Sequence, residues 1–367
     1  MINIDFERLR SLGLTPTLAA AAAQCPAMDP ADANTAPLRL ARVTEVHRET
    51  VRLHDGDTDH GARVWPRLAR RLIDADTALA AGDWGWLAVE PHGQAWVRER
   101  VPPLSHIARR DADGRRHPVV SNVDWALLVM GLDDDFNLRR LERYLALVHG
   151  SGVTPVIVLT KADVAAHAPD ELQRRLDTLR GRVSARVDVL AVNATVAAAA
   201  QALQPYLGAG QTLVLLGSSG AGKSTLTNTL LGAAVQDTGA VRQHDSRGKH
   251  TTTSRSLHRL PTGACVIDTP GLRALRPDVD EATLAASFGD IQSLAAACRF
   301  RDCKHLSEPG CAVRAGVDHD SLRNYHKLAR EARRDTLSVL ERQQLSARWK
   351  VLGKAGKARA RAKRDAA

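Results

Sequence analysis

The stretch that decides the fold is QTLVLLGSSGAGKSTLTNTLLG, at residues 211–232. Thr212 to Leu216 has the apolar character of a buried strand, and the residues after the glycine-rich loop have the pattern of a helix. The loop itself, GSSGAGKS at 217–224, fits G-x-x-x-x-G-K-[ST]. Between a strand and a helix, such a loop can turn its backbone N–H groups towards phosphate. The sequence therefore predicts a nucleotide site in an α/β domain.

Each part of this loop has an expected role. Glycines allow the tight curl, and the start of the following helix adds the positive end of its dipole. Lys223 is expected to bridge the β- and γ-phosphates and to act in catalysis, and Ser224 to ligate Mg²⁺. The predicted phosphate-binding residues are Gly217, Ser218, Ser219, Gly220, Ala221, Gly222, Lys223, Ser224 and Thr225.

A second motif, TKAD, precedes the phosphate loop. It spans Thr160 to Asp163 and follows an apolar run, Pro155 to Leu159, that predicts a strand. The Asp163 carboxylate can accept hydrogen bonds from N1–H and the exocyclic amine of guanine, which adenine does not offer as a pair. The stem of Lys161 can lie against the base. Thr160 stands where many GTPases have asparagine, so its tie to the phosphate loop is expected to be slightly weaker.

The order of the two motifs is unusual. In ordinary GTPases the phosphate loop precedes the guanine-reading motif, whereas here TKAD comes first. This order predicts a circularly permuted GTP-binding domain with a mostly parallel sheet. The loop at Asn193 and Ala194 follows the next predicted strand, and its backbone N–H could reach the guanine carbonyl.

Two further segments belong to the predicted site. Asp268 ends an apolar strand and begins DTPG, so it is expected to bind Mg²⁺, with the N–H of Gly271 sensing the γ-phosphate. Upstream, GKHTTT at 248–253 resembles a switch loop, in which Thr252 or alternatively Thr251 would close over the Mg²⁺.

The residue that orients the attacking water is not the usual one. Leu272 follows the DTPG glycine where Ras-like enzymes have glutamine, so slow intrinsic hydrolysis is expected. His250 is the nearest substitute, because a neutral imidazole can accept a hydrogen bond from water. The alternative is an ordinary exposed loop histidine.

A cysteine and histidine cluster follows the GTP motifs. Cys298, Cys303, His305 and Cys311 form C-x4-C-x-H-x5-C. Three thiolates and an imidazole suit tetrahedral zinc, and four protein ligands indicate one structural Zn²⁺ per chain. The alternative is a chance group of reduced thiols.

The pattern along the chain predicts a multidomain α/β protein. We expect an N-terminal arm or helical lead-in over 1–35 and a domain of short strands, including ARVWPRLARRL, over 36–110. The latter suits an oligonucleotide-binding (OB-type) β-barrel, or a generic small β-domain. The expected order then continues with the GTPase domain at 111–277, a helical zinc-binding domain at 278–346 and a basic tail at 347–367.

Composition limits the classes of function. Lys and Arg number 51 against 41 Asp and Glu, a net charge of +10 that suits a polyanionic partner such as RNA. Eight Lys or Arg fall within 348–364, either as a phosphate-contacting arm or as a solvated end.

No apolar run reaches the length of a membrane span, and three of the five cysteines are clustered, which indicates a metal site rather than disulfide bonds. We expect a cytoplasmic protein that has no membrane partner.

Together these motifs resemble the RsgA (YjeQ) family of small ribosomal subunit biogenesis GTPases. The resemblance covers about 38–328 and is carried by TKAD, GSSGAGKST, GKHTTT, DTPGLR and the cysteine cluster, in that order. VSNVD at 120–124 is also similar to the family's junction between barrel and GTPase domain. Departures are Asn193, the Ala-rich N-terminal arm and the long basic tail.

The resemblance implies an activity and a partner. It implies a GTPase that binds the small ribosomal subunit and its rRNA, is stimulated by the subunit and is released after hydrolysis to GDP. It also implies that His250 is the catalytic histidine. We expect a monomer. The alternatives are another permuted GTPase acting on the large subunit, and an RNA-binding module with a vestigial nucleotide site.

Overall fold

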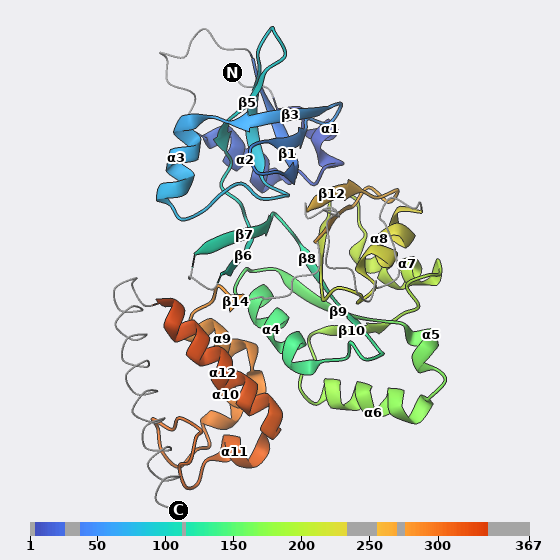
Figure 1. The fold of residues 1–367 in the computed structure, drawn as a ribbon, viewed down its shortest axis with the longest axis vertical. Coiled ribbons are helices and arrows are strands. Elements are labelled where there is room, and N and C mark those ends of the chain that lie inside the picture. The colour runs from blue at the N-terminus through green and yellow to red at the C-terminus, as the bar shows by residue number, and fades with distance from the viewer. Residues whose placement is uncertain (1–3, 26–36, 112–114, 233–254, 270–275, 337–367) are drawn as a thin grey trace, which may run out of the picture.

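The computed structural model describes residues 4–25, 37–111, 115–232, 255–269 and 276–336. A β-barrel, a central sheet covered by helices, and a helical C-terminal part follow one another along the molecule (Figure 1). None of the helices within the described ranges combines the length and apolarity that crossing a membrane requires.

The N-terminal barrel is closed. Its strands are β1 (Leu38–Val46), β2 (Val51–His54), β3 (Asp59–Val64), β4 (Trp84–Val89) and β5 (Ala95–Arg100). They follow the order β1-β2-β3-β5-β4, and β4 pairs back onto β1 to close the ring. Alternate residues such as Val43, Leu53 and Val97 fill its interior. This confirms the predicted OB-type barrel.

One segment expected among the barrel strands is a helix. ARVWPRLARRL continues past β3 into α3 (Pro66–Asp74). Pro66 occupies the first helical turn, where its fixed φ favours a helix and its missing N–H costs nothing. Leu68 and Leu72, four residues apart, pack on the barrel core from one face of the helix. The expectation of a strand there was wrong.

The N-terminal residues are helical and packed. The helices α1 (Phe6–Arg10) and α2 (Pro16–Gln24) are capped by Asp5 and Thr15, whose side chains accept backbone N–H bonds. Their buried leucines pack with Trp84 and Trp86 of the barrel. For residues 4–25, a helical lead-in therefore describes the chain better than a mobile arm.

A small sheet follows the barrel. It consists of β6 (His106–Arg110), β7 (Arg116–Ser121) and β14 (Arg276–Pro277), in the order β14-β6-β7. Strand pairing therefore ends the barrel at β5, before the boundary at residue 110 that the sequence suggested.

The central sheet is mostly parallel, as predicted. Its strands are β8 (Trp125–Gly131), β9 (Thr154–Thr160), β10 (Asp188–Ala191), β11 (Thr212–Leu216), β12 (Ser256–Arg259) and β13 (Cys265–Asp268). Their order is β10-β9-β8-β11-β13-β12, and only β12 runs antiparallel to its neighbours. The outer strand β12 also pairs with β1 through Ser256 and Glu45, which joins this sheet to the barrel.

Helices cover both faces of the central sheet, which explains its continuous apolar strands. They are α4 (Leu138–His149), α5 (Ala162–Ala165), α6 (Pro169–Arg180), α7 (Ala198–Leu203) with a 3-10 turn at Gln204–Tyr206, and α8 (Lys223–Leu231). On β9, Ile157 and Leu159 face the core under α4 and α6, while Val156 and Val158 face the core under α7 and α8.

The C-terminal part is helical. It contains α9 (Glu281–Ser287), α10 (Gly289–Ala295), α11 (Ala312–Gly316) and α12 (His319–Thr336). These helices share an apolar core that reaches Ala146 of α4. Ion pairs join the same surfaces, among them Arg143 with Glu331 and Arg182 with Asp318.

Candidate functional site

The phosphate loop lies between β11 and α8, and its shape depends on two glycines. A Cβ on Gly217 would lie 2.4 Å from the carbonyl oxygen of Val129 on the neighbouring strand β8. Gly222 has a φ of +91°, and a Cβ there would lie 3.2 Å from the Thr160 hydroxyl. A side chain at position 217 would collide with the backbone of β8, and the positive φ at position 222 would strain any residue with a Cβ, so both positions favour glycine.

The Lys223 ammonium lies inside the curl of this loop. Its Nζ donates to the carbonyl oxygens of Gly217 at 3.0 Å and Ser218 at 2.7 Å. Burial lowers the pKa of Lys223, and the charges of Asp268 and Asp135 act in the opposite direction. The loop therefore encloses the amino group of Lys223, and the two carboxylates favour its charged form.

The carboxylate of Asp268 is buried at the end of β13. Burial raises its pKa, which the charge of Lys223 counteracts. Among the described residues, its Oδ1 has no hydrogen-bond partner. An unpaired buried carboxylate oxygen and the Ser224 hydroxyl on the first turn of α8 are the hard oxygen ligands that Mg²⁺ prefers. The residues present thus fit a Mg²⁺ ion.

The TKAD motif lies against the phosphate loop. The hydroxyl of Thr160, fully buried at the end of β9, donates a 2.6 Å hydrogen bond to the carbonyl of Ala221. The threonine therefore does tie the two loops together. Lys161 has a φ of +60°, and Asp163 is exposed in the first turn of α5. The side chain of Asp163 is thus accessible to a ligand from solvent.

The loop after β10 lies beside the helix that follows the phosphate loop. The carbonyl of Ala194 accepts a 2.6 Å hydrogen bond from Thr229 of α8. The side chain of Asn193 instead accepts from the N–H and hydroxyl of Thr195. Asn193 therefore fixes its own loop, leaving backbone groups for any contact with a base.

A loop outside the predicted motifs also joins these elements. Asp133 and Asp135 follow β8 and contact Lys161 and Ser218 respectively. The sequence shows an acidic run after a buried strand. Its position beside the nucleotide motifs follows only from the sheet order, in which β8 lies between β9 and β11.

Four expected site residues lie outside the described ranges: His250, Thr251, Thr252 and Gly271.

The cysteine cluster is brought together as predicted. The ligand atoms of Cys298, Cys303, His305 and Cys311 all lie within 4.8 Å of one another. His305 takes a φ of +59°, and the Glu308 carboxylate accepts three backbone N–H bonds that hold the loop around it. Three soft thiolates with one imidazole could hold a metal ion.

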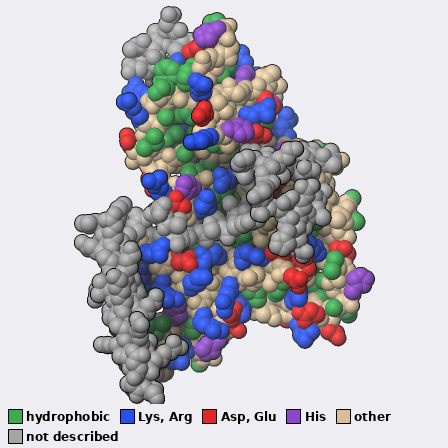
Figure 2. Space-filling model, in the orientation of Figure 1, with side chains coloured by type: hydrophobic (Ala, Val, Ile, Leu, Met, Phe, Trp, Pro, Cys, Tyr) green, Lys and Arg blue, Asp and Glu red, His purple; other side chains and the backbone are tan. Residues whose placement is uncertain are grey.

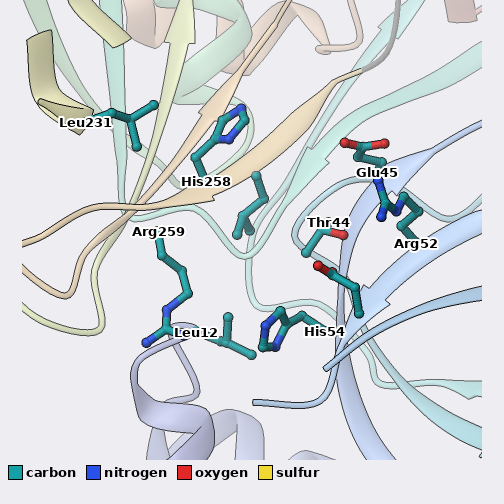
Figure 3. A pocket seen from close by; sticks show the side chains of 10 residues that line it. Leu12, Thr44, Glu45, Arg52, His54, Leu231, His258 and Arg259 are labelled. Carbon is teal, nitrogen blue, oxygen red and sulfur yellow. The ribbon is translucent and has the colours of Figure 1, made fainter. Parts of the chain in front are cut away.

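A separate pocket of about 300 Å³ lies between the barrel and the central sheet. Figure 3 shows Thr44, Glu45 and Arg52 of the barrel on one side and His258 of β12 on the other. Its lining carries both signs of charge, and it lies beside the pairing of β1 with β12. The pocket belongs to the contact between domains rather than to the phosphate loop.

Comparisons with known proteins agree with this geometry. A family model described as RsgA GTPase matches residues 101–277. The protein called small ribosomal subunit biogenesis GTPase RsgA from Xanthomonas oryzae pv. oryzae (strain MAFF 311018) is 46% identical over 296 residues, covering 78% of this chain and 79% of that relative. Its counterpart in Xanthomonas axonopodis pv. citri (strain 306) is 46% identical over 299 residues, with 79% and 80% covered.

Two solved structures share the fold. YjeQ from Thermotoga maritima matches with a TM-score of 0.58 at 21% identity, covering 80% of this chain and 98% of that one. YloQ, described as a circularly permuted GTPase, matches with a TM-score of 0.55 at 22% identity, covering 82% and 97%. At these identities the likeness concerns the fold alone, and it confirms the permuted architecture.

Proposed function

The chain belongs to the RsgA family of GTPases, and from this premise we propose that it acts in the maturation of the small ribosomal subunit. It binds the subunit and its rRNA, hydrolyses GTP to GDP when the subunit stimulates it, and is then released. The relatives are named small ribosomal subunit biogenesis GTPases, and we infer the same role for this chain.

The observation that carries the proposal is the hydrogen bond from Thr160 to Ala221. It joins the end of β9 to the phosphate loop after β11, although the two residues lie 61 positions apart. The base-reading motif and the phosphate loop therefore share one edge of the parallel sheet, where nucleotides bind in such folds.

The residues then divide the work on the nucleotide. Asp163 selects guanine by accepting its N1–H and amine protons, and Lys161 covers the base. Lys223 contacts the β- and γ-phosphates and offsets the charge that develops in the transition state. Ser224 and Asp268 would hold Mg²⁺, which neutralises phosphate charge when bound.

For the segments outside the described ranges, the proposal rests on sequence. Thr252, or alternatively Thr251, would add a ligand to Mg²⁺, and the N–H of Gly271 would contact the γ-phosphate. His250 orients the attacking water, since Leu272 cannot do so. Asn193 and Ala194 contribute their loop to the guanine side.

The cysteine cluster is proposed to hold one structural Zn²⁺. Four protein ligands leave no open position for a substrate, so the ion would stabilise the loop 298–311 rather than take part in hydrolysis.

The partner is proposed from family and charge. A net charge of +10 suits rRNA, and Figure 2 shows Lys and Arg side chains distributed over both the barrel and the parts below it. We propose that the protein works as a cytoplasmic monomer and that the basic tail contributes contacts to phosphate.

Two alternatives make different predictions. A large-subunit factor would respond to the other subunit, and a vestigial site would not turn over GTP. The presence of Lys223, Ser224, Asp163 and Asp268 supports an active enzyme.

The deciding experiment measures GTP hydrolysis with purified small or large subunits and without either. We expect stimulation by the small subunit only, loss of turnover in Lys223→Ala, and at least about a tenfold loss of stimulated turnover in His250→Ala with little change in GTP binding. Equal stimulation by both subunits, or none, would contradict the proposal.

A further inference from the structure

The loop GLDDDF, at residues 131–136, lies between the two halves of the nucleotide site. It follows β8, which pairs with β9 on one side and β11 on the other. TKAD follows β9 and the phosphate loop follows β11. The loop after β8 therefore lies at the same edge of the sheet, between these two motifs.

Asp133 contacts the guanine-reading side. Its Oδ2 accepts a 2.6 Å hydrogen bond from Nζ of Lys161, and about a third of each side chain is exposed. Burial alone would raise the pKa of Asp133, but the hydrogen bond and charge of Lys161 hold it below its usual range. The carboxylate is thus ionised at neutral pH and fixes the end of the lysine chain.

Asp135 contacts the phosphate side. Its Oδ1 accepts a 2.6 Å hydrogen bond from the hydroxyl of Ser218, and its Oδ2 accepts one from the N–H of Gly131 at 3.1 Å. Ser218 in turn offers its carbonyl to Lys223. Arg140 of α4 pairs with the same carboxylate. Asp135 therefore fixes the loop that carries the phosphate-binding lysine.

The acidic loop is itself anchored. Arg175 of α6 donates to the carbonyls of Leu132 at 2.7 Å and Asp133 at 3.1 Å. A Cβ on Gly131 would lie 2.3 Å from Oδ1 of Asp133, so a larger residue there would displace this carboxylate from its present position. A loop fixed at its backbone can hold the side chains that it contacts in place.

We propose that GLDDDF is an acidic clamp that preorganises both halves of the nucleotide site, with Asp133 positioning Lys161 over the base and Asp135 positioning the phosphate loop. Both are positioning residues, since they act through Lys161 and Ser218. A lysine side chain and a glycine-rich loop lose much conformational freedom on binding, and a clamp that restricts them beforehand lowers that cost. The inference rests on the proposed guanine-nucleotide site.

The test is a pair of double-mutant cycles, read as the Kd of fluorescent GDP. Asp133→Asn and Asp135→Asn should each weaken binding by about threefold to tenfold, the range for partly exposed charge-assisted bonds. Asp133→Asn should add less than about twofold in a Lys161→Met background, because the amino group that it holds is already gone. Asp135→Asn should add less than about twofold in a Ser218→Ala background, because its remaining bonds to Gly131 and Arg140 do not reach the phosphate loop.

The control is Asp134→Asn, which removes the same charge from an exposed side chain of the same loop and should change the Kd by less than about twofold. If Asp133→Asn and Asp135→Asn match the control, or keep their full effect without Lys161 or Ser218, the clamp is refuted. A wild-type protein that does not bind GDP would instead refute the proposed nucleotide site.

Discussion

Arg42 of the barrel strand β1 donates a 2.9 Å hydrogen bond to the hydroxyl of Thr212, the first residue of the strand that leads into the phosphate loop. The same guanidinium, fully buried, also donates to the carbonyls of Leu12, Gly82 and Asn122. One side chain therefore ties the N-terminal helices, the barrel and the central sheet together.

Arg42→Met should destabilise the protein by about 2–4 kcal/mol, because it leaves several buried carbonyls without a donor. Urea unfolding followed by circular dichroism measures this. Arg63→Met, at an exposed position of β3, is the matched control and should change the free energy of unfolding by less than about 0.5 kcal/mol. Equal stability of the two variants would contradict the role assigned to Arg42.

Asp163→Asn should shift base preference from GTP towards xanthosine triphosphate. The amide can donate to the xanthine carbonyl, where the carboxylate only accepts. Competition binding with the two triphosphates measures the shift. Retention of tight GTP binding, with no gain for the xanthine nucleotide, would show that another residue reads the base.

The sequence predicted the parts of the site whose spacing is local. Thr160 and Gly217 could be placed because each follows an apolar run that has the length of a strand, and Lys223 because the loop motif fixes its spacing from Gly217. Helix α3 was not predicted because its few apolar residues follow directly on β3 and read as more of the same strand. The signal that could have identified it is Pro66, a residue that favours the first turn of a helix. Asp133 and Asp135 depend on β8 lying between β9 and β11, a pairing order that no local pattern states.

Cys303→Ser should lose the metal that the purified wild-type protein is expected to carry at about one Zn²⁺ per chain. Because metal binding in such small sites contributes folding free energy, hydrogen exchange over 298–311 should also become faster. Zinc content by mass spectrometry measures the first effect. Cys25→Ser is the control, since Cys25 lies outside the cluster, and it should keep the ion. A metal-free wild type would overturn the zinc assignment.

His106, on β6 beside the barrel, should make stability depend on pH. Burial, together with the charges of Arg100 and Arg116, lowers its pKa to about 4. As the pH falls, His106 therefore takes up its proton in the unfolded chain before it does so in the folded protein. The contribution of His106 to the free energy of unfolding is complete above about pH 6.5 and declines towards pH 4.

The expected loss is at most about 3 kcal/mol between these pH values. His106→Gln, whose amide does not titrate, should flatten this part of the profile in urea unfolding. His92→Gln, at an exposed position, should leave the profile unchanged. A wild-type slope retained in His106→Gln would assign the pH dependence to other groups.

Asn324→Leu should loosen the C-terminal helices from the central domain. The buried amide of Asn324, on α12, donates to the Glu142 carboxylate of α4 at 2.6 Å and to the carbonyl of Arg139 at 3.1 Å. Burial raises the pKa of Glu142, and the bond from Asn324 opposes that rise. Without the donor, a buried carboxylate is left short of a partner, which costs about 1.5–3 kcal/mol.

Hydrogen exchange along α12 measures the effect, which should be confined to α12 and the helices α9 to α11 that share its core. Glu142→Gln is the informative comparison, because the glutamine oxygen can still accept from Asn324 while the buried charge is removed. It should therefore perturb α12 less than Asn324→Leu does. If the order of the two variants is reversed, the charge of Glu142, through Arg182 at 3.6 Å, carries the docking instead of the amide.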